Sequence, residues 1–151
     1  MSDVAVRGEA AEVARAEAQA VMSMLDDGER RGRLADLLAA VAEGRVGEAD
    51  AEALSELLDL GLRTGRLRAV YGPGGEQAAL ALYRRLPAGR ELAESTRELN
   101  AALEELEGRE LERVQVHALG PGEYGLSVVA DGYEIGLHLG PSGPRITTIG
   151  A

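Results

Sequence analysis

The chain has 151 residues, of which 45% are hydrophobic and 28% charged, a composition typical of a folded globular protein rather than a disordered one. Its net charge of −10 disfavours binding to a phosphate backbone, so we expect no nucleic-acid partner. No apolar run approaches the roughly 20 residues needed to cross a bilayer, and the early glutamates Glu9, Glu12 and Glu17 are unlike a secretory signal. These features predict a cytoplasmic protein with no membrane partner.

Cysteine is absent, which excludes disulfides, thiolate nucleophiles and cysteine metal ligands. Phenylalanine, tryptophan and lysine are absent too, so the only aromatic side chains are four tyrosines and every basic side chain except histidine is an arginine. A core of Leu, Val and Ala follows. No phosphate-binding or dinucleotide-binding motif is present, and the sequence predicts no cofactor.

Residues 1–108 have the apolar spacing of about five helices. In the second, Leu34, Leu37, Leu38 and Val41 recur at helical spacing until Gly44, after Asp27 and Gly28 have interrupted the first. The expected ranges of the other helices in chain order are 4–26, 48–64, 76–86 and 90–107.

The segment Arg66–Gly75 contains Tyr71-Gly72-Pro73-Gly74-Gly75, which predicts an internal loop or hinge. Its backbone amides precede a helix and are a conceivable anion cradle. Glu76 at the start of that helix and the lack of lysine argue against phosphate binding.

After Gly108 the apolar period changes from 3.6 to 2, which predicts three or four antiparallel strands. Asp131-Gly132 is typical of a two-residue type I′ turn, so Val128 should face Ile135 and Leu126 should face Leu137. The last strand, residues 145–149, has no register fixed by the sequence. The chain is therefore expected to have an α+β fold, with a helical region at 1–108 and a β-meander at 109–151 packed together as one domain.

The same register places polar side chains in cross-strand rows on one face of the sheet. One row contains His117 and His138 on either side of Gly125, with the surface between them expected to be open. The residues that would bind a ligand on this face are His117, His138, Ser127, Gln115 and Glu134. A solvated polar face explains the same pattern more simply.

No catalytic residue or metal site is assigned on that face. Metal binding would need a third and a fourth ligand, which the sequence does not supply in a recognised spacing. Ser127 lies in a flat strand and lacks the sharp turn that positions a nucleophilic serine.

The last helix repeats apolar residues at alternating spacings of four and three, the rhythm of paired helices. This ladder is either part of the chain's own core or an interaction seam, with a twofold dimer as the default assembly. The residues assigned to it are Leu92, Leu99, Leu103 and Leu106.

Chemically reactive side chains are scarce, whereas apolar helical faces are plentiful. The sequence therefore favours a non-catalytic protein-protein interaction, assembly or accessory subunit that binds another protein or a copy of itself. The alternative is a small-molecule- or metal-binding protein, or an enzyme, that uses the polar sheet face around His117 and His138.

Overall fold

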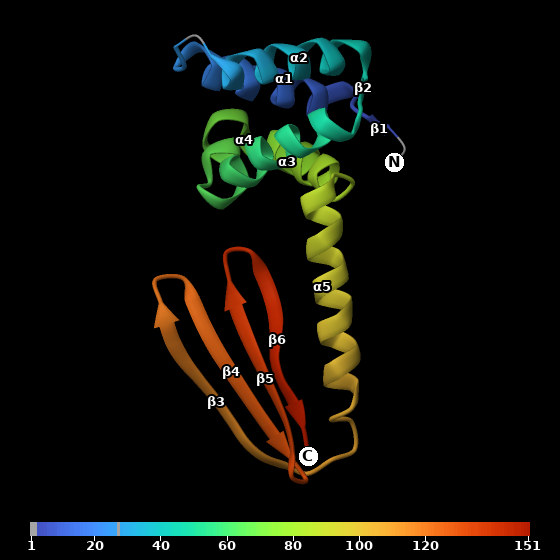
Figure 1. The fold of residues 1–151 in the computed structure, drawn as a ribbon, viewed down its shortest axis with the longest axis vertical. Helices are drawn as coiled ribbons and strands as arrows, with labels where there is room; N and C mark the ends of the chain where they lie inside the picture. Colours follow the sequence, from blue (N-terminus) through green and yellow to red (C-terminus); the bar gives the residue numbers. More distant parts are fainter. Residues whose placement is uncertain (1–2, 27) are drawn as a thin grey trace. The chain divides into compact units, whose positions relative to one another are not determined.

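The computed structural model describes residues 3–26 and 28–151 (Figure 1). The expected helix break at Asp27 lies outside the described residues. Two compact units are distinguished, Met1–Arg90 and Glu91–Ala151, and each is described by itself. The division falls within the last helix, and residue 108 lies inside the second unit.

Within the described residues, five helices precede a four-stranded antiparallel sheet, which confirms the α+β architecture expected from the sequence. A small two-stranded sheet near the start of the chain was not predicted. The helices are α1 (Gly8–Ser23), α2 (Glu29–Glu43), α3 (Glu48–Arg63), α4 (Arg66–Tyr83) and α5 (Pro87–Glu104). The strands are β1 (Val4–Ala5), β2 (Arg45–Val46), β3 (Leu111–Gly120), β4 (Glu123–Ala130), β5 (Tyr133–Gly140) and β6 (Gly143–Gly150).

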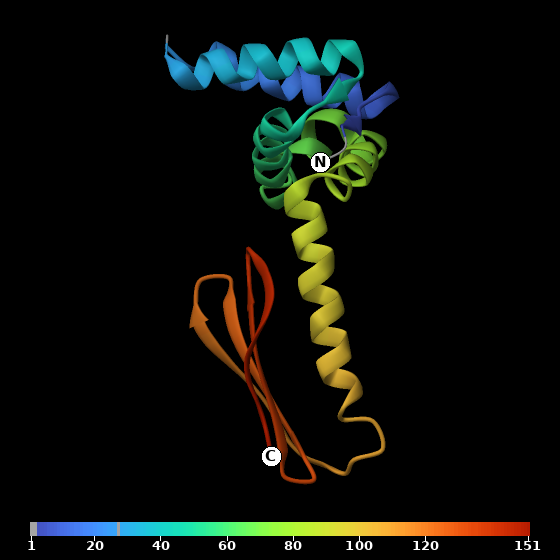
Figure 2. The same ribbon diagram turned by 45° about the vertical axis from the view of Figure 1, so that its right-hand side comes forward.

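In the first unit, α1 packs against α2 and α4, and α3 packs against α4. Figures 1 and 2 show α1 and α2 side by side. The core between the helices consists of aliphatic side chains together with Tyr83, since the sequence offers no phenylalanine or tryptophan to fill it. Its largest fully buried members include Leu37, Leu54, Leu58, Leu67 and Leu82.

The start of the first helix differs from the prediction. Val4 and Ala5, predicted as helical, form β1, which pairs antiparallel with β2 so that Val4 lies opposite Val46. Both valines are buried, and valine is well suited to a strand. The pairing joins residues far apart in the sequence, so local periodicity carried no sign of it.

The predicted loop at 66–75 was wrong, because α4 is helical on both sides of a break at Gly72. Gly72 has φ 73° and ψ −179°, a conformation open essentially only to glycine. Pro73 follows at the first position of the next helical segment, where its fixed φ is favourable and its missing N–H costs nothing. The Gly-Pro pair thus separates two helical segments instead of opening a loop.

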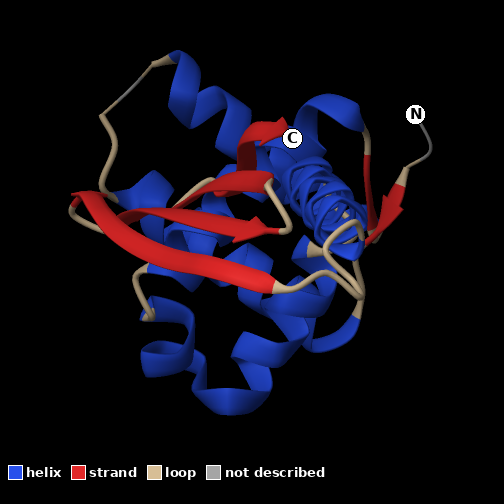
Figure 3. Cartoon of the chain, turned by 90° about the horizontal axis from the view of Figure 1, so that it is seen from below, coloured by secondary structure: helices blue, strands red, loops and turns tan. Residues whose placement is uncertain are grey.

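In the second unit the strands follow the order β3-β4-β5-β6. The predicted register is confirmed: Val128 lies opposite Ile135 and Leu126 opposite Leu137. Asp131 (φ 48°) and Gly132 (φ 74°) both have positive φ, as a type I′ turn requires. The helix α5 runs alongside the sheet, and Figure 3 shows it end-on next to the strands.

The sheet has one apolar face, which gathers residues from all four strands. Its members include Val114, Val116, Leu126, Val128, Ile135, Leu137, Ile146 and Ile149. A bulge in β6 keeps both isoleucines on this face. Leu137 lies opposite Ile146 and Gly136 opposite Thr148, so Thr147 is the extra residue. Without it, the odd spacing of Ile146 and Ile149 would place them on opposite faces.

Candidate functional site

The opposite, polar face of the sheet carries the cross-strand rows expected from the sequence. His117 lies opposite Gly125, and Gly125 lies opposite His138. The fourth strand extends this row, because His138 lies opposite Arg145. The structure therefore aligns two imidazoles and one guanidinium across four strands.

The surface between the two histidines is not open, contrary to the expectation. A Cβ atom at Gly125 would collide with the His117 ring, so the imidazole lies over the glycine. Glycine at position 125 is what allows His117 to fold inward over the sheet.

His138 is the more enclosed of the two, with 14% of its side chain exposed. Its Nε2 lies 3.6 Å from Oε2 of Glu123. Its Nδ1 is buried and is the one such side-chain polar atom in residues 3–26 and 28–151 with no hydrogen-bond partner. An unsatisfied buried polar atom is uncommon in folded proteins and costs stability.

Ser127 and Glu134, predicted on the same face, contact each other directly. The Ser127 hydroxyl donates a hydrogen bond of 2.9 Å to Oε1 of Glu134, and the same oxygen lies 3.9 Å from the Arg113 guanidinium. Glu134 is thus already paired. Gln115 is exposed on β3 and does not line the cavity described next.

A cavity of about 670 Å³ lies over this row. It is lined by His117, Leu119, Gly125, Leu126, Ser127, Glu134, Gly136, Leu137, His138, Arg145, Ile146, Thr147 and Thr148. Four of the five predicted ligand residues therefore line one hollow. Its volume lies within the roughly 300–1,000 Å³ of small-molecule sites.

Sequence reasoning missed Arg145, Thr147 and Thr148, which β6 contributes to the cavity. A Cβ atom at Gly136 would lie 2.9 Å from Oγ1 of Thr147, so the bulge fills space that the glycine leaves empty. The signal was indirect: Ile146 and Ile149 can share the apolar face only if the strand gains one residue between them.

The described residues contain no group of three or more His, Asp or Glu side chains placed to hold a metal ion. None of the described helices is both long and apolar enough to span a membrane.

A second feature of this unit is the exposed part of its apolar face along β3. Ile135 and Leu137 on β5 are buried, whereas Val114 is 54% and Val116 62% exposed. Tyr124, which lies opposite Ala118, is also exposed.

The helix ladder occupies a more covered position. Leu99, Leu103 and Leu106 are half-buried, and Leu92 is 38% exposed. Cδ1 of Leu92 lies 2.6 Å from where a Cβ atom would be at Gly143, the first residue of β6.

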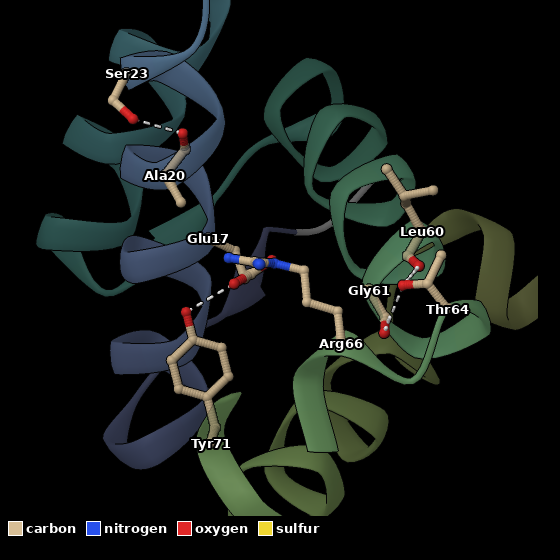
Figure 4. A network of polar contacts seen from close by, with 8 residues as sticks. All are labelled: Glu17, Ala20, Ser23, Leu60, Gly61, Thr64, Arg66 and Tyr71. Atoms are coloured by element: carbon tan, nitrogen blue, oxygen red, sulfur yellow. Dashed lines mark hydrogen bonds and ion pairs between the residues drawn. The ribbon is translucent and has the colours of Figure 1, made fainter. Parts of the chain in front are cut away.

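The first unit contains one buried carboxylate with a full set of contacts (Figure 4). Glu17, 2% exposed, accepts a 2.7 Å hydrogen bond from the Tyr71 hydroxyl and a 3.0 Å one from Nε of Arg66. Burial, and then the hydrogen bond to Glu17, raise the pKa of Tyr71 to about 12. This cluster joins α1 to α4, and both carboxylate oxygens of Glu17 are engaged in it.

Comparisons with protein families, with curated proteins and with solved structures find no match to this chain.

Proposed function

We propose that this protein is a non-catalytic interaction subunit that pairs with a second copy of itself through the exposed strand β3. The observation that carries the proposal is the exposure of β3. Every residue from Leu111 to Leu119 is exposed, and the run includes Val114 and Val116. An edge strand with unpaired backbone groups and exposed apolar side chains is a template for pairing with another strand.

The two edges of the sheet differ in their capacity to pair. β6 contains Pro144, which has no N–H to donate, and the bulge at Thr147 interrupts its ladder. Both devices protect edge strands. In β3 the irregularities lie at the two ends, and residues 113–118 pair with β4 in regular register. The regular, proline-free edge is therefore β3, which we call the pairing edge.

A second copy of β3 matches this edge in its alternation of apolar residues and in its lack of acidic side chains. Pairing about a twofold axis that is perpendicular to the sheet and passes at Gln115 makes the two strands antiparallel and sets Val114 of one copy opposite Val116 of the other. Residues 113–118 contain no acidic side chain, although the chain as a whole has a net charge of −10. Two copies can therefore meet here without placing carboxylates opposite each other.

Light scattering and sedimentation equilibrium test the proposal through the mass in solution. We expect the wild type to have twice the mass of one chain. Val116→Lys, which places a charge on the pairing edge, should be folded by circular dichroism and have the mass of one chain. Its matched control is Ile149→Lys on the other edge, where the side chain is 52% exposed, and this variant should remain a dimer.

A wild type of single-chain mass contradicts the proposal. So does a dimer that survives Val116→Lys but is lost when Leu99 and Leu103 are both replaced by Glu, because that result places the interface on the α5 ladder. Hydrogen exchange adds a backbone readout: the amides of one alternating set in residues 113–118 should exchange slowly in the dimer and quickly in Val116→Lys.

A further inference from the structure

The cavity opens on the polar face and shares only His117 and Leu119 with β3, whereas the proposed pairing uses the backbone and the apolar side chains of that strand. We infer that this cavity binds a small organic monocarboxylate, with Arg145 holding the carboxylate group. The inference extends beyond the proposed function and does not depend on it.

The charges in the cavity favour an anion. Arg145 has no ion pair among the described residues, and it lies in one cross-strand row with His138 and His117. A planar guanidinium binds a carboxylate through two parallel hydrogen bonds. Beside the row, Glu134 is already engaged with Ser127 and Arg113, and Oε2 of Glu123 lies 3.6 Å from Nε2 of His138.

Those same carboxylates limit the charge of the ligand. Glu134 lines the cavity and Glu123 lies at His138. A single negative charge at Arg145 is balanced locally, whereas a phosphate dianion would face repulsion from both glutamates. A monocarboxylate therefore suits the site better than a phosphate.

The rest of the cavity fits an organic body. Leu119 from β3 lines one part, and hydroxyl groups from Thr147 and Thr148 line another. His138, whose buried Nδ1 has no hydrogen-bond partner, is one of the residues that line this cavity.

Heteronuclear NMR titration of the full chain tests the inference with benzoate as a monocarboxylate with an apolar body, and with inorganic phosphate as the anion control. We expect saturable shifts of the His117 and His138 imidazoles and of the Arg145 side chain with benzoate. Phosphate should bind at least tenfold more weakly.

Arg145→Gln should weaken benzoate binding at least tenfold, the loss expected for a charge-assisted contact. The matched control is Arg97→Gln, which removes the same charge from α5, where Arg97 pairs with Glu94. This control should bind benzoate like the wild type. Neither change touches the pairing edge, so the mass in solution reports on the dimer independently.

The inference is overturned if benzoate shifts do not saturate, or if Arg145→Gln and Arg97→Gln bind benzoate equally. It is also overturned if phosphate binds as tightly as benzoate, because the proposed discrimination by charge would then be absent.

Discussion

At the scale of single residues, the chain stabilises a buried charge by surrounding it with donors from another helix. Glu17 on α1 has almost no contact with water, and both of its oxygens accept hydrogen bonds from α4. A buried carboxylate deprived of a donor retains its cost of desolvation but loses its compensation. Residues on α4 therefore control the stability of a charge on α1.

Replacing Tyr71 by Phe should lower the free energy of unfolding by about 1–3 kcal/mol, because Glu17 loses one of its donors while remaining buried. Urea denaturation followed by circular dichroism measures the change. Tyr124→Phe is the control, since that ring is 47% exposed and its hydroxyl has no hydrogen bond within the described chain. A Tyr71→Phe variant as stable as this control would argue against the contact.

The same tyrosine gives the wild type a pH-dependent stability on the alkaline side. The pKa of Tyr71 rises from 10 to about 12, so the folded protein retains the phenolic proton more strongly than the unfolded chain. This stabilisation is complete below pH 10 and is lost as the pH rises toward 12. Unfolding measured across this range should show a loss of stability that is smaller in Tyr71→Phe.

At the scale of elements, the break in α4 depends on a conformation that only glycine adopts without strain. Replacing Gly72 by Ala should cost about 1–3 kcal/mol, because φ 73° with ψ −179° is unfavourable for any residue with a Cβ atom. No atom lies within 4 Å of the added Cβ, so the cost is that of the backbone and not of a collision.

Gly32→Ala is the opposite case and serves as the control. Gly32 lies within α2, is exposed, and likewise has nothing within 4 Å of an added Cβ atom. Alanine is favoured over glycine in a helix by about 0.5–1 kcal/mol, so this variant should be more stable than the wild type. If thermal unfolding shifts in the same direction for both variants, the interpretation of Gly72 fails.

The elements also show what the sequence could predict. Alternation and the Asp131-Gly132 turn were sufficient for the register of β3, β4 and β5, and thus for the row of His117, Gly125 and His138. That success rests on the strict period of two in a strand. Arg145 lies before the bulge and pairs with His138 in regular register from the turn, but the segment Gly140-Pro141-Ser142-Gly143-Pro144 does not show where that turn ends and β6 begins. The bulge at Thr147 adds one residue to the period, so the positions of Thr147 and Thr148 were beyond the same reasoning.

The other differences between the predictions and the structure each have their own cause. The pairing of Val4 with Val46 joins distant residues, and the Gly72-Pro73 pair fits both a loop and a helix break. The closing of His117 over Gly125 depends on a side-chain rotamer, which backbone periodicity does not fix.

At the scale of the whole molecule, the acidic balance should make the proposed dimer sensitive to salt. Each chain carries a net charge of −10, so two copies repel each other although the paired strands themselves contain no acidic residue in 113–118. Raising the ionic strength from about 0.01 M to 0.15 M shortens the screening length from roughly 30 Å to 8 Å. The dissociation constant from sedimentation equilibrium should therefore fall as salt is added.

Val116→Lys should remain monomeric at both salt concentrations, since its pairing edge is blocked. Weaker association of the wild type at higher salt would instead mean that ion pairs between the copies hold the dimer together.

The irregular strand β6 has a further consequence for the size of the assembly. With Pro144 and the bulge at Thr147, only one side of the sheet can accept a new strand. Each chain then has one edge strand through which it can pair with another chain. In the proposed dimer both β3 strands are paired and only the irregular β6 edges remain, so we expect assembly to stop at two copies and not to extend into a fibre.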